Sequence, residues 1–396
     1  MEKFLPIVLG SDLNTYTIVR EIHEAYGIKS AVASSRVLLP CIHSEIIEFY
    51  TRENFSKDDR IFVEVLNEIY QKNKDQYSEF IIFAPDDVMR TLCIRNIDKL
   101  SFSPKHPYAD REVLAKLRTK SDFYEGIKDL HLAPQTLVAN TDNYKTLSYP
   151  EDVFIKADND VLYKTLDFEG WQKGYHSTSI PQTLAILENI FANGYTDDVI
   201  VQEFVAGGDG TEYSVDGYRT KDGIAMSLCR NTLLDKRVEW IGNFVAKVDS
   251  DEEIIYDYAR DIVETLGVYG LFNIDFKKNI ETGKIYAFEI NLRQGRCHYY
   301  ASQSGVNLSQ MAIEDLINNS FTPQRGNIAF AYYNLDLDQT IENLHGELKE
   351  EFLDQSRREN TKNPLIYEKD WGLRRRLKIK SYLDKLSKET FAVKTV

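Results

Sequence analysis

The sequence predicts an α/β domain, followed by α+β segments and a helical C-terminal extension. At 396 residues the chain is too long for one ordinary hydrophobic core, so we expect two or three domains. Strands alternate with helices over residues 1–108, which predicts a parallel sheet. Further on, a glycine-rich turn leads into an alternating strand, and a β-hairpin follows later, so we expect antiparallel sheet there.

The first predicted domain, residues 1–108, opens on "FLPIVLGSDLNTYTIVREIHEAYGIKSAVASS". This stretch predicts a buried strand, a turn, a helix whose apolar residues keep helical spacing up to Gly27, and a second strand. Another buried strand, "EFIIFAPDD", ends in acidic residues. The turn after the first strand lacks the full GxGxxG pattern, so a dinucleotide site is not indicated.

The second predicted domain covers residues 109–200 and follows a proline-containing hinge, "SFSPKHPYADRE", that breaks any helix. It begins with a helix that carries Lys120. It continues into a strand in which Lys156 is the only charge inside an apolar run. Lys116 and Arg118 lie close enough to Lys120 to be alternatives to it.

The third predicted domain covers residues 201–325 and the extension covers residues 326–396. Within the third domain, "GLFNIDFKKNIETGKIYAFEINLR" predicts a hairpin that turns at Glu281-Thr282-Gly283. In the extension, the apolar positions predict a single amphipathic helix along Leu337, Ile341, Leu344, Leu348 and Phe352. The tail, residues 371–390, has seven basic and two acidic residues and predicts a solvated helix face. Weak contact with a membrane surface or an anionic precursor is the alternative for this tail.

Charge and cysteine content exclude several classes of protein. A net charge of −14 argues against a general nucleic-acid binder. The N-terminal apolar run is too short for a signal peptide and no run approaches a membrane span, so we expect a cytoplasmic protein. The four cysteines form no CxxC pair, which favours free thiols over a disulfide framework or zinc site. They are Cys41, Cys93, Cys229 and Cys297. The sequence leaves the oligomeric state open.

The stretch "YAFEINLRQGRCHYY", residues 286–300, carries the strongest chemical signal. Glu289 and Asn291 are two residues apart on a strand and share a face, while Phe288 and Ile290 point the other way into a core. The hairpin brings Asp275 opposite this pair. Three oxygen ligands on one face suit Mg²⁺, which takes further ligands from water and phosphate. Alone, such a set is more often a polar surface.

Two further groups point to a nucleotide. Lys120 and Lys156 suit phosphates as point charges. Between them and the hairpin lies "IVQEFVAG", in which a polar pair sits beside two apolar residues and suits the edge of a base. These residues are Gln202, Glu203, Phe204 and Val205. An exposed strand end is the alternative for the polar pair.

Taken in order, these motifs resemble the ATP-grasp superfamily, in which two α+β subdomains close over ATP. "IVLGSDLNTY", "FYEGIKDLHLAPQT", "IGNF" and "FEINLRQGR" look most like the D-aspartate ligases of bacterial peptidoglycan cross-bridge synthesis, over roughly the first four-fifths of the chain. The resemblance implies a pre-ATP-grasp domain, then two ATP-grasp subdomains. It also implies a carboxylate–amine ligase that uses ATP and Mg²⁺ and forms an acyl phosphate. The implied substrates are D-aspartate and the lysine amine of a muramyl-pentapeptide precursor.

Within that resemblance, Arg293 is the expected charge clamp on the transferred phosphoryl group. Arg296 is expected to meet a substrate carboxylate, and Arg230 is a further candidate cation. An ATP-grasp ligase with another amino acid and another amine or cell-envelope precursor stays an alternative. A non-catalytic nucleotide-binding partner is a second alternative, which the presence of all three metal ligands disfavours.

The sequence departs from the family pattern in two places. The segment after Lys156 has only Gly170 and Gly174, where many ATP-grasp enzymes carry a glycine-rich loop over the phosphates, so a lid there must use side chains or be mobile. After "QGR" we expect small hydroxyl residues, but the chain has Cys297-His298-Tyr299-Tyr300. The identity of the donor amino acid therefore stays open.

Overall fold

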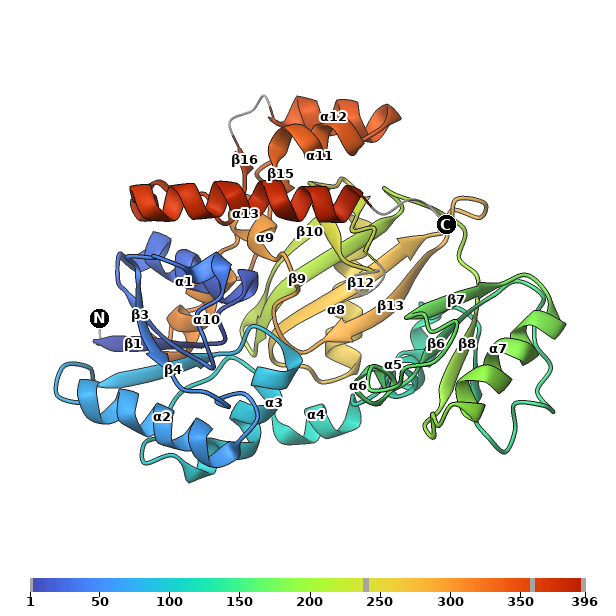
Figure 1. Ribbon diagram of the computed structural model, residues 1–396, viewed down its shortest axis with the longest axis horizontal. Helices are drawn as coiled ribbons and strands as arrows, with labels where there is room; N and C mark the ends of the chain where they lie inside the picture. Colours follow the sequence, from blue (N-terminus) through green and yellow to red (C-terminus); the bar gives the residue numbers. More distant parts are fainter. Residues whose placement is uncertain (1–2, 238–241, 357–359, 393–396) are drawn as a thin grey trace.

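Three sheets, built from consecutive stretches of chain, form the body of the molecule (Figure 1). This computed structural model describes residues 3–237, 242–356 and 360–392. Within these ranges no helix is both long and apolar enough to cross a membrane.

The first sheet confirms the predicted α/β start. Its four strands are all parallel, in the order β3-β2-β1-β4. Asp12 caps the first helix by accepting a hydrogen bond from the Thr15 amide, and Gly27 ends that helix with φ 67°. The elements are β1 (Phe4–Leu9), α1 (Leu13–Tyr26), β2 (Ser30–Ser34), β3 (Ile47–Thr51), α2 (Asp59–Asn73), β4 (Glu79–Phe83) and α3 (Asp87–Asn96).

The second sheet is antiparallel, in the order β5-β8-β6-β7. One of its faces packs on α7, where Leu187 joins Ile155 and Val201 in an apolar cluster. Lys156 alternates with these residues along its strand and so points to the opposite face. The elements are α4 (Arg111–Lys116), α5 (Lys120–Gly126), β5 (Thr136–Ala139), β6 (Val153–Ala157), α6 (Asp160–Tyr163), β7 (Gly174–Ser177), α7 (Ile180–Ala192) and β8 (Val199–Glu203).

The third sheet has eight strands, in the order β13-β12-β9-β10-β11-β15-β16, with β14 beside β10. Helix α8 covers one face, where Ile262 packs with Phe272 and Ile274. The predicted hairpin is present as β12 and β13. The elements up to β15 are β9 (Glu212–Thr220), β10 (Gly223–Leu234), β11 (Phe244–Val248), α8 (Ile254–Thr265), β12 (Gly270–Lys278), β13 (Ile285–Asn291), α9 (Tyr299–Gln303), α10 (Leu308–Leu316), β14 (Gln324–Arg325) and β15 (Ala331–Tyr333).

The prediction of one continuous helix from Leu337 to Phe352 is wrong. The chain forms α11 (Leu337–Asn343) and α12 (Gly346–Ser356), and Gly346 adopts φ 54° between them. The break lets Leu344 turn into an apolar cluster with Phe352. Strand β16 (Thr361–Lys362) then pairs with β15, so the extension also adds to the third sheet.

The basic tail forms α13 (Leu373–Phe391), which lies along one side of the molecule (Figure 1). The prediction of a solvated face is only partly right. Arg374 and Lys378 are exposed, but Arg375 is fully buried, 3.2 Å from the Asp370 carboxylate and above the ring of Tyr16. Contact of the exposed side with a membrane surface stays a prediction.

One apolar cluster joins the first sheet to α9, α10 and α13. The predicted domain boundaries, after residues 108, 200 and 325, stay a prediction. The shared cluster means that the N-terminal and C-terminal parts of the chain pack together.

Candidate active site

A cavity of about 1020 Å³ opens where the three sheets meet. The capping residues Asp12 and Asp86 line it from the carboxyl ends of β1 and β4, and the third sheet forms its floor. Among its lining residues, lysine and arginine outnumber aspartate and glutamate by ten to six. In a chain of net charge −14, such a cavity favours anionic ligands.

Two carboxylates face each other on the floor of this cavity, as predicted. Asp275 on β12 lies directly opposite Glu289 on β13, and Ser214 donates a 2.8 Å hydrogen bond to Asp275. Burial, with the nearby Glu289 charge, raises the pKa of Asp275 to about 7.

The predicted amide ligand, Asn291, lines the same cavity. It donates a 3.0 Å hydrogen bond to Asn273 and accepts one of 3.1 Å from Arg293. Among the residues that the structure describes, no three histidine, cysteine, aspartate or glutamate side chains cluster as metal ligands. The donor set is therefore the predicted pair of carboxylates with one amide.

The expectation that Phe288 points into a core is wrong. The register between β12 and β13 shifts between Asp275 and Phe276, which marks a β-bulge on the facing strand. Phe288 is only half-buried, and its ring lies 5.4 Å from the ammonium of Lys156. Ile290 does pack against the apolar cluster under α8, as expected.

Two of the three predicted arginines line the cavity, and the third does not. Arg293 lines the cavity and forms an ion pair with Asp87 of α3, with its two nitrogens 2.7 and 3.1 Å from one carboxylate oxygen. Arg296 lines the same cavity and is exposed. Arg230 is not among the lining residues and pairs instead with Glu351 of α12.

Only one of the two predicted lysines lines the cavity. Lys120 does so at the first turn of α5, directly after the capping residue Thr119. Lys156 is not among the lining residues and donates a 2.7 Å hydrogen bond to the hydroxyl of Tyr124 on the same helix. The segment after Lys156, which lacks a glycine-rich loop, contributes Lys164 and Lys173 to the cavity wall.

The four residues predicted to contact the base, Gln202 to Val205, lie in different surroundings. The Gln202 amide is buried and donates a 2.8 Å hydrogen bond to Thr136, so it is engaged within the second sheet. Val205 is also buried, and Phe204 stacks on His176 with ring centres 3.9 Å apart.

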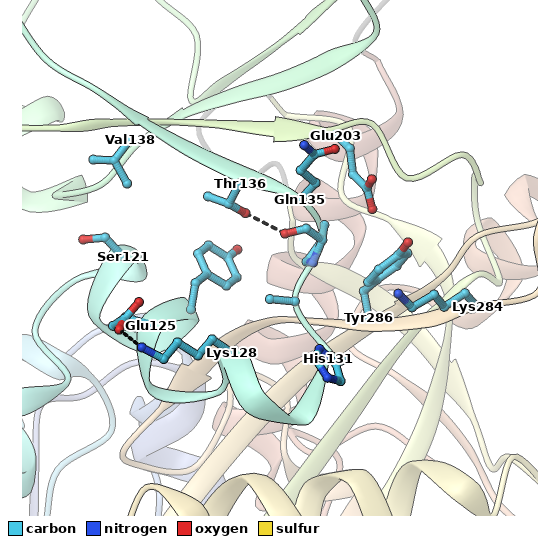
Figure 2. A pocket seen from close by; sticks show the side chains of 13 residues that line it. Ser121, Glu125, Lys128, His131, Gln135, Thr136, Val138, Glu203, Lys284 and Tyr286 are labelled. Atoms are coloured by element: carbon cyan, nitrogen blue, oxygen red, sulfur yellow. Dashed lines mark hydrogen bonds and ion pairs between the residues drawn. The ribbon is translucent and has the colours of Figure 1, made fainter. Parts of the chain in front are cut away.

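Glu203 lines a second cavity of about 590 Å³ (Figure 2). In this view Lys284 and Tyr286 from the hairpin lie below it, and Lys128 and His131 lie on the far side. No residue of this second cavity lines the first one. The Glu203 carboxylate therefore lies away from the phosphate lysine Lys120.

Two charged residues beside the base-edge strand were not predicted from the sequence. Glu212 on β9 pairs with Lys277 on β12 at 3.4 Å, and the Lys277 ammonium lies 6.0 Å from the ring of Phe204. Burial raises the pKa of Glu212, while Lys277 and Lys156 oppose this shift. The sequence signal that could have indicated this ion pair is one acidic and one basic residue on two neighbouring strands.

A third lysine was also not predicted. Lys247 is the only charge in the apolar strand "FVAKV", the same signal that marks Lys156, and it lines the first cavity. Burial lowers the pKa of Lys247, but the fields of Cys229, Cys297, Asp216 and Asp275 outweigh it and leave this pKa above its usual range.

The unexpected residues after "QGR" face the core rather than the cavity. The Tyr300 hydroxyl donates a 3.0 Å hydrogen bond to Asp216, and the His298 ring nitrogen Nε2 lies 3.5 Å from a buried Glu21 oxygen. Neither Cys297 nor Tyr299 lines either cavity. This departure from the family pattern therefore leaves the cavity lining unchanged.

Comparison with known proteins agrees with this arrangement. The family described as "ATP-grasp in the biosynthetic pathway with Ter operon" matches residues 196–334, the stretch that holds the carboxylate pair. A D-aspartate ligase of Enterococcus faecium is 28% identical over 398 residues, covering 96% of this chain and 94% of that protein. Both similarities agree with the ATP-grasp resemblance of the sequence motifs.

Solved structures show the same ATP-grasp fold. N5-carboxyaminoimidazole synthetase from Staphylococcus aureus superimposes with a TM-score of 0.59 at 15% identity, over 86% of this chain and 85% of that one. L-amino acid ligase from Bacillus licheniformis gives a TM-score of 0.55 at 12% identity, over 80% and 74%. This chain is an ATP-dependent carboxylate–amine ligase with the ATP-grasp fold.

Proposed function

We propose that this chain joins the β-carboxylate of D-aspartate to the lysine side-chain amine of a muramyl-pentapeptide precursor, in the synthesis of peptidoglycan cross-bridges. The observation that carries the proposal is the opposed pair of Asp275 and Glu289 in a cationic cavity, in a chain that aligns with a D-aspartate ligase over almost its full length. Because the reaction consumes ATP, we also propose that it takes place in the cytoplasm.

ATP lies, in this proposal, with its base near Phe204 and its phosphates toward Lys120 and Lys156. The aromatic stack of Phe204 and the ion pair of Glu212 with Lys277 support a base and ribose site there. Both lysines project toward the space between the second and third sheets, where point charges suit phosphate oxygens. Gln202 has no direct part, since its amide is engaged within the sheet.

Asp275, Glu289 and Asn291 would hold one or two Mg²⁺ ions, which when bound neutralise and orient the phosphate oxygens. The donor set fits this ion, because Mg²⁺ keeps waters and takes few protein ligands. The raised pKa of Asp275 supports the fit, since a bound cation would offset both the burial and the Glu289 charge that raise it.

Lys120, Lys156 and Arg293 neutralise charge while the γ-phosphoryl group leaves ADP and bonds to a carboxylate oxygen of the amino acid. Asp87 fixes the Arg293 guanidinium from the N-terminal sheet. The amine nitrogen then attacks the acyl carbon, phosphate leaves with that oxygen, and the amine gives up a proton. Arg296 lines the same cavity, where its planar fork suits a substrate carboxylate. Arg230 has no part, because it pairs with Glu351.

The test is a substrate screen on the purified chain with ATP and Mg²⁺. D-aspartate with the lysine-containing precursor is expected to give ADP and a product with the mass of the new amide. L-aspartate and D-alanine are expected to give little product. If an unrelated amino acid gives the amide and D-aspartate gives none, the assignment of D-aspartate is wrong and the ligase reaction stands.

A further inference from the structure

Lys247 is a buried lysine to which the proposed reaction gives no role. It lies on β11, lines the first cavity and is only 4% exposed. Over residues 3–237, 242–356 and 360–392 no hydrogen bond or ion pair reaches its ammonium, and the centre of the Tyr300 ring lies 4.9 Å away. The Asp216 and Asp275 carboxylates act on this ammonium, but from beyond ion-pair distance, so no carboxylate of the described chain contacts it directly. Its position on the cavity therefore indicates an anionic ligand.

Lys247 ends a polar row that crosses five neighbouring strands of the third sheet. Glu289 faces Asp275, Asp275 accepts a hydrogen bond from Ser214, and Ser214 accepts one of 3.1 Å from Asn231. Asn231 in turn lies directly opposite Lys247. The carboxylates stand at one end of the row and the ammonium at the other.

The length of this row sets what fits along it. From Asp275 to Lys247 there are three strand spacings, or about 14 Å between backbones. The long lysine side chain shortens this gap, which leaves room for a phosphoryl group at the carboxylate end and a small molecule beyond it. An anion bound at Lys247 thus lies at the opposite end of the row from the carboxylate pair.

We propose that Lys247 binds the carboxylate of the amino-acid substrate that is not phosphorylated, the α-carboxylate if D-aspartate is the donor. This proposal rests on the proposed ligase function and assigns the specificity of that same cavity. The sequence favours Arg296 for such a role, but Arg296 is exposed, and a contact with an exposed cation discriminates weakly. An amino acid without a second carboxylate leaves the buried Lys247 unpaired, which a site built this way rejects.

The first experiment replaces the charge with a side chain of similar length, Lys247→Met. We expect the KM for D-aspartate to rise by roughly tenfold to a hundredfold, as for loss of a hydrogen bond to a charged group, with the KM for ATP within about twofold. The control is Lys278→Met on β12, since Lys278 pairs with Glu252 away from the cavity. A rise in the KM for ATP with no change for D-aspartate overturns the proposal and assigns Lys247 to the phosphates.

The second experiment changes the substrate rather than the protein. D-isoasparagine keeps the β-carboxylate but carries an amide in place of the α-carboxylate. The unmodified chain is expected to prefer D-aspartate strongly, and Lys247→Met is expected to lose most of that preference. An unchanged preference in Lys247→Met contradicts the proposal.

A third measurement separates a binding role from a structural one without any turnover. Because no hydrogen bond or ion pair holds the ammonium in the ligand-free chain, Lys247→Met is expected to keep a cooperative melting transition, while the stabilisation by added D-aspartate disappears. Lys247→Arg keeps the charge and is expected to restore part of that stabilisation. A clear loss of stability in both variants means that Lys247 holds the fold, and the proposal fails.

Failure of this inference differs from failure of the proposed function. If the unmodified chain forms no amide from D-aspartate, the proposed substrate is wrong. If it forms the amide and Lys247→Met keeps the same KM for D-aspartate, only the role of Lys247 is wrong.

Discussion

Asp275 and Glu289 lie opposite each other on the cavity floor, and burial together with the Glu289 charge makes ionisation of Asp275 less favourable. That arrangement is unfavourable for a structural pair and favourable for holding a divalent cation. Ser214 and Asn291 complete the polar surroundings from neighbouring positions. We therefore propose that the pair serves the reaction rather than the stability of the fold.

At the scale of the residue, Glu289→Gln is expected to lower the rate of ADP release by more than about a hundredfold, because a charged metal ligand is lost without a change of shape. Its melting temperature is expected to stay level or to rise, since a buried like-charge contact is removed. Glu281→Gln, at the exposed turn of the same hairpin, is the control and is expected to keep full activity. Near-normal ADP release from Glu289→Gln with Mg²⁺ present would refute the metal assignment.

Some positions in this site can be predicted from the sequence, because local spacing fixes which residues share a strand face. The two-residue spacing of Glu289 and Asn291 puts both on one face, so their place on the cavity was predictable. The bulge that turns Phe288 toward Lys156 depends on the register between two strands, which no local pattern gives. The engagement of Gln202 by Thr136 likewise depends on which strand is its neighbour.

At the scale of the element, α13 is part of the fold rather than a free basic tail. Asp370, just before it, is fully buried and accepts hydrogen bonds from Tyr16, Ser44 and the Glu45 amide. The same carboxylate lies 3.2 Å from Arg375 of α13. Charge pattern alone suggested a solvated helix, because Tyr16 and Ile42, which Arg375 also contacts, lie more than three hundred residues away in sequence.

Two matched substitutions measure how much the contact between α13 and the N-terminal domain contributes to the free energy of unfolding. Asp370→Ala is expected to lower the free energy of unfolding by about 3 kcal/mol or more, since it leaves the buried Arg375 charge unpaired. Asp384→Ala removes a surface partner of Lys388 within α13 and is expected to change it by less than about 1 kcal/mol. Denaturant titration gives both values. Equal effects of the two substitutions would mean that the buried contact does not hold the helix in place.

At the scale of the whole molecule, three sheets meet at one cationic cavity, and one apolar cluster joins the two ends of the chain. The order of strands and helices, and the metal and phosphate motifs along it, made the ATP-grasp fold predictable. The cavity itself was not, because Asp12, Asp87 and Lys247 come from distant segments. Lys247 carried the same signal as Lys156, a single charge in an apolar strand, but only the structure places it on the cavity.

The central claim, that this cavity joins a carboxylate to an amine through an acyl phosphate, is tested most directly by following oxygen. D-aspartate labelled with ¹⁸O in its β-carboxylate is incubated with the chain, ATP, Mg²⁺ and the lysine-containing precursor, and the inorganic phosphate is analysed by mass spectrometry. Transfer of the phosphoryl group to the carboxylate predicts one ¹⁸O atom in the phosphate for each amide formed. Amide formation with unlabelled phosphate, or with label in AMP, would contradict the claim.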